Sequence, residues 1–478
     1  MRVKRLKMQS FRGIGDLTLD FDESEPTVLI GINGVGKSSI LDCIAIFMSQ
    51  MTAHIQISSE TIRFFSNKDI NNCREETHNE ITLLINSSPE IFLNITKIKT
   101  GDNQELNIID RELFQIGLLI KEKLQLISNN EYHKFQPILS SISPIIDSTV
   151  FKNPPSDTDT PSILSSLQYS KGLQTAIDDL RLQLKTVPES SIPLVVYYPV
   201  NRAVFDMPLE ISENYLFKQL DAYEEALTGG KIDFKTFFEW FRNREDLENE
   251  IRRDNSDYRD KQLEGVRQAI SSLIPDFSNL RVQRSPLRMT VQKKGEELIV
   301  NQLSDGEKCL LAMVGDLARR LAIANPGLSE PLQGSGIVLI DEIELHLHPK
   351  WQREIIPALT RTFPNCQFIV TTHSPQVVSH VKPEGIYILE KTDEGVIAKR
   401  PESSFGRDSN QILEDLMDVP ARPQNIKDRL LELFRLIDAG DLVGARELRQ
   451  QLASEIGADE PDFVKADVLI RRKEILGR

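Results

Sequence analysis

The sequence has 478 residues, a net charge of −14 and 40% hydrophobic residues, which is the composition of an ordinary globular protein. The acidic balance argues against a chain that coats nucleic acid by bulk charge, although it leaves room for a local basic groove. No apolar run approaches the ~18 residues of a membrane span, no signal peptide is visible at the N-terminus, and the four cysteines form no C-x-x-C pair. We therefore expect a cytoplasmic protein with reduced thiols and no membrane contact.

The N-terminal segment predicts two antiparallel strands. Apolar and polar residues alternate over residues 2–21, around a turn at residues 13–15, and Arg12 lies directly before this turn. A short apolar run at residues 27–30 follows, which is typical of a buried parallel strand.

The strongest motif comes next, because residues 31–38 (GINGVGKS) fit the P-loop pattern G-x-x-x-x-G-K-[ST]. Apolar residues at helical spacing follow it, so the motif joins a strand to a helix. Its glycines let backbone N–H groups curl around phosphate oxygens, Lys37 is expected to reach the β- and γ-phosphates of ATP, and the Ser38 hydroxyl to ligate Mg²⁺. The expected nucleotide-binding residues here are Gly31, Asn33, Gly34, Val35, Gly36, Lys37, Ser38 and Ser39.

The middle of the chain predicts a hairpin and two insertions. Residues 80–86 and 91–97 read as the hairpin, and residues 105–190 as a helical insertion. A core strand near residues 194–199 precedes a second helical insertion, whose aromatic stretch 234–242 either packs internally or forms a partner-binding surface. The strand-like stretch 281–294 carries five basic residues, which either contact a phosphate backbone or are ordinary surface charge.

Two further motifs follow the insertions. Residues 303–308 (LSDGEK) precede a long helix, and the helix N-terminus with Ser304 and the Gly306 N–H group is expected to contact a γ-phosphate. The apolar strand 336–340 ends in two carboxylates: Asp341 is expected to hold Mg²⁺, and Glu342 to orient or deprotonate the attacking water. A last core strand ends at residue 372, directly before His373.

These motifs resemble those of the RecF/SMC-like ABC ATPases, on the residues SFRG at 10–13, the P-loop, LSDGEK and the strand ending in Asp341 and Glu342. The resemblance implies that Arg12 can approach the nucleotide, although a surface arginine is the alternative. It also implies that His373 senses the γ-phosphate, and that the signature of one subunit, including Glu307, completes the ATP site of a second. A homodimer or larger homo-oligomer follows. The implied catalytic residues are Lys37, Glu342 and His373, and the implied metal ligands are Ser38 and Asp341.

The predicted fold class is α/β, an ABC-type P-loop ATPase head with a mixed sheet, an antiparallel sub-sheet, helical insertions and a C-terminal helical appendage. Helices are expected at residues 426–438, 442–456 and 461–476. The expected domains are an N-terminal ATPase lobe (1–104), a helical insertion (105–190), a core strand (191–208), a second helical insertion (209–280), a C-terminal ATPase lobe (281–420) and a helical docking region (421–478).

This layout resembles, over nearly the whole chain, the PtuA-type ATPases of Septu antiviral systems. The resemblance is carried by residues 197–202, 238–242, 303–308, 341–349 and 426–476. It implies an ATP- and Mg²⁺-dependent oligomer that holds an HNH-type nuclease, PtuB, and regulates it in defence against phage; the sequence shows no H-N-H constellation of its own. Two alternatives stay open: a DNA-repair ATPase that clamps DNA itself, and a nucleotide sensor that rarely hydrolyses ATP.

Overall fold

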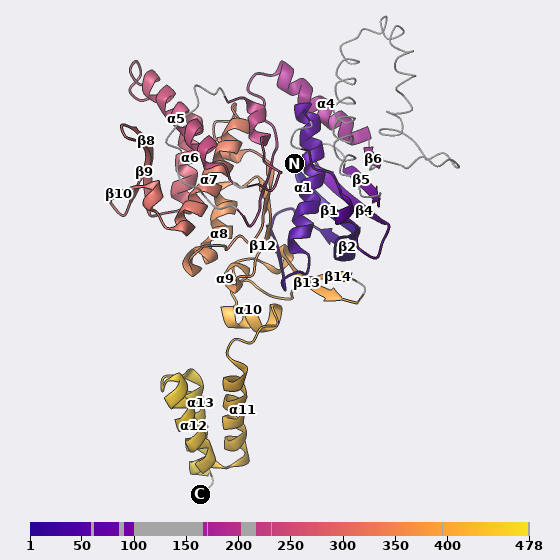
Figure 1. The fold of residues 1–478 in the computed structure, drawn as a ribbon. Helices are drawn as coiled ribbons and strands as arrows, with labels where there is room; N and C mark the ends of the chain where they lie inside the picture. Colours follow the sequence, from indigo (N-terminus) through magenta and orange to yellow (C-terminus); the bar gives the residue numbers. More distant parts are fainter. Residues whose placement is uncertain are drawn as a thin grey trace, which may run out of the picture. The chain divides into compact units, whose positions relative to one another are not determined.

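The computed structural model describes residues 1–58, 62–85, 90–99, 166–169, 171–201, 217–230, 232–393 and 395–476 (Figure 1). The chain divides into two compact units, Met1–Arg407 and Asp408–Arg478. Residue 202, at the end of the range 197–202 named above, and most of the predicted insertion 105–190 lie outside the described residues.

A mostly parallel sheet forms the core of the first unit. Its strand order is β14-β13-β3-β12-β11-β7, and only β14 is antiparallel to its neighbour. Strands β7, β11 and β12 are buried along their whole length because both faces of the sheet are covered. The bounds are β3 (Thr27–Gly31), β7 (Leu194–Tyr198), β11 (Gly336–Ile340), β12 (Cys366–Thr371), β13 (Ile386–Thr392) and β14 (Gly395–Lys399).

An antiparallel sheet with the order β2-β1-β4-β5-β6 lies in the same unit. Its strands are β1 (Arg2–Phe11), β2 (Ile14–Asp20), β4 (Glu76–Leu84), β5 (Ile91–Ile98) and β6 (Ser166–Tyr169). The two sheets are joined by the Gln367 side chain of β12, which accepts from the Val3 N–H at 2.7 Å and donates to the Val3 carbonyl at 2.9 Å. Strand β6 corrects the prediction of an all-helical insertion over 105–190, because residues 166–169 pair with β5.

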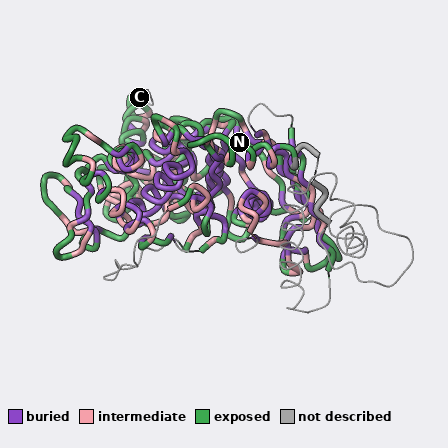
Figure 2. The backbone as a smooth tube through the Cα atoms, turned by 90° about the horizontal axis from the view of Figure 1, so that it is seen from above, coloured by how far each residue is buried: buried purple, intermediate pink, exposed green. Residues whose placement is uncertain are grey.

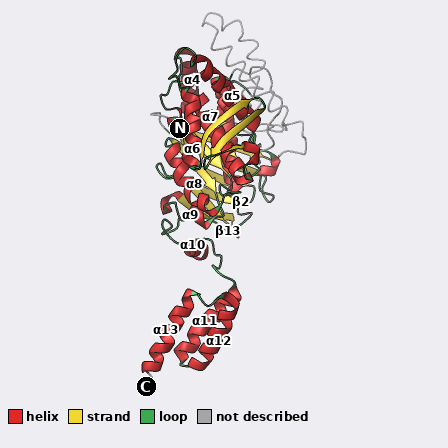
Figure 3. Ribbon diagram, turned by 90° about the vertical axis from the view of Figure 1, so that its left-hand side faces the viewer, coloured by secondary structure: helices red, strands yellow, loops and turns green. Residues whose placement is uncertain are grey.

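Helices cover both faces of the parallel sheet (Figures 1 and 3). Helix α1 (Lys37–Gln56) contacts β3, β7, β11 and β12. Helix α7 (Asp305–Ala324) contacts β7, and it also contacts the helices α5 (Phe234–Ile251) and α6 (Lys261–Leu273). Every residue of α7 from 309 to 324 is buried. Figure 2 shows buried, intermediate and exposed residues along the backbone. The other α-helices that the structure describes in the first unit are α4 (Lys171–Thr186), α8 (Pro349–Thr362) and α9 (Pro375–Val378).

The aromatic stretch of α5 is part of this core. Phe237, Phe238, Trp240 and Phe241 are all buried. A Cβ added to Gly315 of α7 would lie 2.8 Å from the Phe237 ring, so the two helices pack in close contact at this glycine. The stretch therefore packs internally, and the alternative of an exposed partner-binding surface is wrong.

The basic stretch 281–294 lies in a small antiparallel sheet with the order β10-β9-β8. Its strands are β8 (Phe277–Arg284), β9 (Leu287–Lys293) and β10 (Glu296–Ile299). Four of its five basic side chains are paired with carboxylates: Arg281 with Glu297, Arg284 with Glu245 and Asp246, Lys293 with Glu307, and Lys294 with Asp276. The fifth, Arg288, donates to the Gln283 side chain. Much of the positive charge of the stretch is thus neutralised within the chain.

The second unit contains the predicted helices around a core of its own. They are α11 (Gln424–Ala439), α12 (Leu442–Ile456) and α13 (Pro461–Leu476), preceded by α10 (Ser409–Leu416). Leu433, Leu452 and Phe463 are among its fully buried side chains. The unit begins at Asp408 rather than at the predicted residue 421, and Glu414 of α10 accepts from Lys427 of α11 at 2.9 Å.

The predicted fold class is confirmed: a mixed sheet, an antiparallel sub-sheet, covering helices and C-terminal helices are all present. Among the described helices, none combines the length and the apolar character that crossing a membrane requires.

Candidate active site

Three strands of the parallel sheet end side by side at the predicted site. Strand β12 lies between β3 and β11, and all three run in the same direction, so their C-terminal ends meet at one edge. The P-loop follows β3, Asp341 and Glu342 follow β11, and His373 lies just beyond β12. Ligands of open α/β sheets bind at this edge, so the fold brings the predicted P-loop and carboxylate residues together.

The P-loop is shaped by glycines that no other residue replaces easily. Gly36 has a φ of 110° and forms the N-cap of α1. Gly31 has a φ of 147°, and a Cβ there would lie 2.5 Å from the Leu389 carbonyl oxygen. Both positions therefore require glycine. The loop between them exposes Asn33 and Gly34, and Ser38 is exposed in the first turn of α1.

Lys37 begins α1 and turns back over the loop. Its Nζ donates to the carbonyl oxygens of Gly31 at 2.8 Å and Ile32 at 3.1 Å. Burial lowers the pKa of Lys37, while the nearby carboxylates of Asp341, Glu342 and Glu344 oppose this shift. The ammonium group therefore lies in the field of the carboxylates after β11, although those residues are about 300 positions away in the sequence.

Thr371 is bonded both to the predicted metal ligand Asp341 and to the predicted catalytic residue Glu342. Its hydroxyl donates to Asp341 Oδ1 at 2.6 Å and accepts from the Glu342 backbone N–H at 2.7 Å. The Asp341 N–H donates to the carbonyl of Tyr198, at the end of β7, at 2.9 Å. Glu342 itself has a φ of 46°, a conformation that is uncommon for a residue with a side chain and marks a sharp turn out of the strand.

Glu344 is a site residue to which the sequence motifs assigned no role. Its carboxylate accepts from the Thr372 hydroxyl at 2.7 Å and from the His373 backbone N–H at 2.6 Å. It thereby joins the loop after β11 to the loop that carries His373. The acidic run Asp341-Glu342-Ile343-Glu344 was the only signal in the sequence that could have indicated it.

Arg12 lies beside the first turns of α1, where it is held by carboxylates. Its Nη1 donates to Asp42 at 2.7 Å, its Nε to Asp69 at 2.9 Å, and its Nη1 lies 3.5 Å from the Ser39 hydroxyl. Arg63 also bonds to Asp42, because its Nη2 donates to Asp42 Oδ1 at 2.9 Å. The Arg12 guanidinium thus lies near Ser39, the residue that follows the P-loop motif, in an ion-pair cluster that the sequence did not indicate.

The signature residues form the start of α7. Ser304 is the N-cap, and its hydroxyl and backbone N–H both donate to Glu307 Oε2, at 2.9 and 3.0 Å. The other Glu307 oxygen is 2.6 Å from Lys293 Nζ. Burial raises the pKa of Glu307, but the Lys293 ammonium and the Ser304 donors outweigh it and lower the pKa. In this arrangement Glu307 caps its own helix and pairs with β9, which differs from the expectation that it faces a nucleotide.

Gly306 lies against the loop that follows Asp341 and Glu342. A Cβ at Gly306 would be 2.2 Å from the carbonyl oxygen of His346, so the two backbones touch. His346 has a φ of 65°, and His348 caps α8 by accepting from the Lys350 N–H. The structure therefore places the signature directly beside this loop of the same chain.

The donor set of the site is consistent with Mg²⁺. The Ser38 hydroxyl and the Asp341 carboxylate are oxygen donors, which this hard cation prefers, and both belong to the same sheet edge. Within the described part of the chain, no group of three His, Cys, Asp or Glu residues forms a dedicated metal cluster. A magnesium ion held here would therefore share its coordination with phosphate oxygens and water.

Comparisons with known proteins agree with these features. The family described as "AAA ATPase domain" matches residues 1–378. The chain is 29% identical over 541 aligned positions to the Retron Ec83 probable ATPase of Escherichia coli, covering 99% of this chain and 87% of the relative. It is 42% identical over 76 residues to the Septu protein PtuA of Bacillus mycoides, covering 16% of this chain and 10% of the relative.

The resemblance to Septu PtuA is thus confirmed, but over a shorter stretch than the retron relative, which matches nearly the whole chain. Among solved structures, the SMC head domain from Thermotoga maritima is similar, at 14% identity and a TM-score of 0.40, covering 84% of this chain and 100% of that domain.

Proposed function

The chain belongs to the AAA ATPase domain family, and on this premise we propose that it binds and hydrolyses ATP as a RecF/SMC-like ABC-type ATPase that regulates an associated HNH nuclease in antiphage defence. The observation that carries the ATPase part is the position of Lys37. It follows β3, and Asp341 and Glu342 follow β11 at the same edge of the sheet, so its ammonium lies in the field of their carboxylates. A phosphate bound there would be neutralised by Lys37 and Mg²⁺, and the charge of Mg²⁺ would be balanced by the carboxylates.

In the proposed mechanism the P-loop N–H groups and Lys37 hold the phosphates, and Lys37 exchanges its two loop carbonyls for phosphate oxygens. Mg²⁺, held by Ser38 and Asp341, would neutralise charge on the phosphates. Glu342 accepts a proton from the attacking water or orients it, and His373 contacts the γ-phosphate. The Thr371 and Glu344 hydrogen bonds hold the Asp341 carboxylate and the backbones of Glu342 and His373 in place.

We further propose that the signature acts on the nucleotide of a second copy, in a homodimer or larger homo-oligomer. Ser304 is exposed at the N-terminus of a long helix, where partial positive charge favours a phosphate. This position of the signature is the basis for expecting two ATP molecules to join two heads.

The ATPase proposal is tested by ATP binding and steady-state hydrolysis of the purified chain. Lys37→Ala is expected to lose ATP binding, whereas Lys382→Ala, which removes an exposed lysine paired with Glu25, serves as the control. Glu342→Gln is expected to bind ATP and to lower turnover by ~10²–10⁴, the usual contribution of a general base. ATP affinity that survives in Lys37→Ala would contradict the P-loop assignment.

The regulation of a nuclease rests on resemblance. Similarity to a protein named Septu protein PtuA and to one named Retron Ec83 probable ATPase is the basis for proposing a role in defence. We propose a cytoplasmic location, and the independently packed helices α11–α13 are the proposed docking region. Affinity purification of the tagged, natively expressed protein is expected to recover a small HNH nuclease at fixed stoichiometry. The same experiment with a chain that ends before residue 408 tests the docking region.

The alternative of a DNA-repair ATPase would require direct contact with duplex DNA. The best basic stretch, 281–294, is largely ion-paired with carboxylates, which weighs against it. ATP-dependent binding of bare duplex with a steep salt dependence would revive this alternative. A third possibility, a sensor that binds ATP and rarely hydrolyses it, predicts a wild-type turnover no faster than that of Glu342→Gln.

A further inference from the structure

Tyr198 is bonded both to the loop that carries the catalytic carboxylates and to the helix that begins at the signature. It is the last residue of β7, in register with Ile340 of β11. Its carbonyl accepts the backbone N–H of Asp341 at 2.9 Å. The main chain of Tyr198 therefore fixes the point at which Asp341 leaves the sheet.

The Tyr198 side chain extends from the same residue to α7. Its hydroxyl donates to Asp316 Oδ2 at 2.9 Å, and the two residues are only 2% and 3% exposed. Burial raises the pKa of Tyr198, so the hydroxyl keeps its proton. Burial also favours a neutral Asp316, but Arg320 and Arg319 outweigh it and lower the pKa of Asp316 to about 2. The bond thus joins a neutral donor to a charged acceptor, which makes it stronger than a neutral pair.

Asp316 is itself held firmly in the middle of α7. It accepts from Arg319 Nη2 and from Arg320 Nε, each at 2.7 Å. Arg320 Nη1 also donates to the carbonyls of Ala222 and Glu224, both at 2.8 Å. Directional bonds therefore tie this part of the signature helix to β7 and to the segment at residues 222–224.

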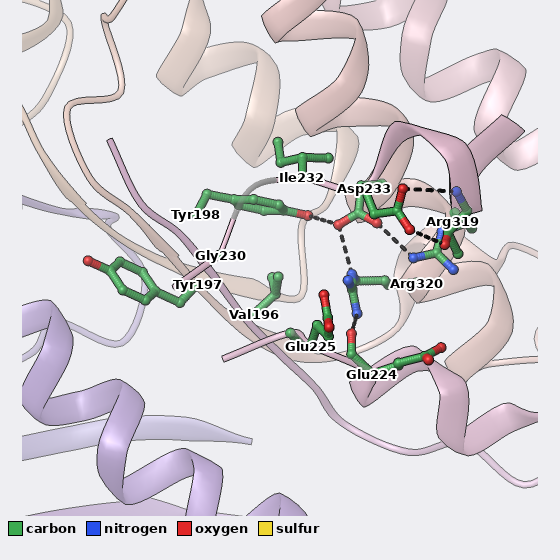
Figure 4. Close-up of a pocket in the computed structure, with 13 residues that line it drawn as sticks. Val196, Tyr197, Tyr198, Glu224, Glu225, Gly230, Ile232, Asp233, Arg319 and Arg320 are labelled. Atoms are coloured by element: carbon green, nitrogen blue, oxygen red, sulfur yellow. Dashed lines mark hydrogen bonds and ion pairs between the residues drawn. The ribbon is translucent and has the colours of Figure 1, made fainter. Parts of the chain in front are cut away.

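A cavity of about 130 Å³ lies beside this cluster. Tyr198, Asp316, Arg319 and Arg320 contribute to its lining (Figure 4). Arg319 Nε is buried and has no hydrogen-bond partner among the residues that the structure describes. The cluster is thus strongly bonded through Asp316, and it borders the cavity, where side chains are not closely packed. This turn of α7 therefore has room to move without displacing close-packed side chains.

We propose that the Tyr198–Asp316 hydrogen bond transmits movement of the signature helix to Asp341, which makes Tyr198 a positioning residue for ATP hydrolysis. The inference rests on the proposed ATPase function. A signature that engages the nucleotide of a second copy pulls on the N-terminus of α7. Because α7 is bonded to the Tyr198 hydroxyl and Asp341 to the Tyr198 carbonyl, the helix and the carboxylate move together. Hydrolysis is thereby coupled to engagement of the two heads.

The variant Tyr198→Phe removes the bond and keeps the ring. It is expected to lower kcat for ATP by about 2- to 30-fold, the range that follows from typical coupling energies between linked sites, and to leave KM for ATP unchanged. The matched control is Tyr223→Phe, which removes a buried hydroxyl that donates to the Pro193 carbonyl at 2.7 Å, next to the other end of β7. The control is expected to keep the wild-type kcat at a similar loss of thermal stability.

The outcomes separate the two claims. An active wild type with an unchanged kcat in Tyr198→Phe, or an equal loss of kcat in both variants, overturns the coupling and leaves the ATPase function intact. A wild type that hydrolyses no ATP overturns both.

If Tyr198→Phe does not fold, hydrogen exchange of the wild-type protein decides the question. A non-hydrolysable ATP analogue is expected to change exchange in peptides covering 309–320 and 336–342 together, and a change confined to one of them overturns the coupling.

Discussion

The Glu344 carboxylate accepts a hydrogen bond of 2.6 Å from the backbone N–H of His373. Its other oxygen accepts from the Thr372 hydroxyl at 2.7 Å. Glu344 follows β11 and His373 follows β12, so one side chain holds the loops of two neighbouring strands in a fixed relation. The backbone of the proposed γ-phosphate sensor is thereby tied to the loop that carries Asp341 and Glu342.

We therefore predict that Glu344→Ala lowers ATP turnover by ~10–100-fold, a typical effect of losing a residue that orients a catalytic group. The His373 N–H and the Thr372 hydroxyl would both lose their acceptor. Glu344→Gln keeps an amide oxygen that can accept from His373, so it should retain more activity than the alanine variant. Steady-state hydrolysis measures both; equal losses would mean that the charge of Glu344, and not its hydrogen bonds, matters.

A second prediction concerns the contact between Gly306 and His346. Gly306→Ala would place a Cβ 2.2 Å from the His346 carbonyl oxygen and force the signature away from this loop. ATP binding to the P-loop should survive, whereas hydrolysis and ATP-dependent association of heads should be lost. Gly265→Ala in α6 is the control, because its Cβ would meet Leu332 at an ordinary 3.7 Å; binding assays and light scattering compare the two.

A third prediction is a pH dependence that originates at Asp316. Burial raises its pKa, but Arg320 and Arg319 outweigh this, so the pKa falls from 3.8 to about 2 on folding. A lowered folded-state pKa contributes stability that is complete above the unfolded value and lost as pH falls through the folded value. The contribution is about 2 kcal/mol at neutral pH, at about 1.36 kcal/mol per pKa unit.

The free energy of unfolding of Asp316→Asn should therefore differ most from that of the wild type near pH 6, where the variant leaves two buried arginines without their negative partner. The difference in free energy should shrink towards pH 3. Urea unfolding at several pH values measures the free energies, with the exposed Asp254→Asn as control. A difference that stays constant with pH would show that Asp316 is not the titrating group.

The core of the fold follows from local patterns that the sequence contains. The apolar runs of β3 and β11 are buried on both faces, so they need no periodicity and are recognised by their composition. The stripes of α11 and α12 repeat at helical spacing, and the structure places Leu433 and Leu452 in their shared core. The P-loop and the carboxylates at 341 and 342 were found because their spacing is tied to strand ends.

What the sequence did not indicate depends on distant contacts. Glu344 acquires its role from Thr372 and His373, and Glu307 from Lys293 of another element. The basic stretch 281–294 allowed two interpretations because pairing with carboxylates of other elements, such as Glu245 of α5, depends on the folded structure. Strand β6 was missed because four residues are too few to show alternation, and pairing with β5 defines it.

The central claim is that each ATP site is built from two copies of the chain, with Lys37 from one and Ser304 from the other. Mixing two differently tagged variants, Lys37→Ala and Ser304→Arg, and isolating the mixed dimers through both tags tests it most directly. Each variant alone should be inactive. The mixed dimer should regain ATP hydrolysis, because it holds one site with an intact Lys37 and an intact Ser304. Mixed dimers that remain as inactive as the separate variants would contradict the shared site.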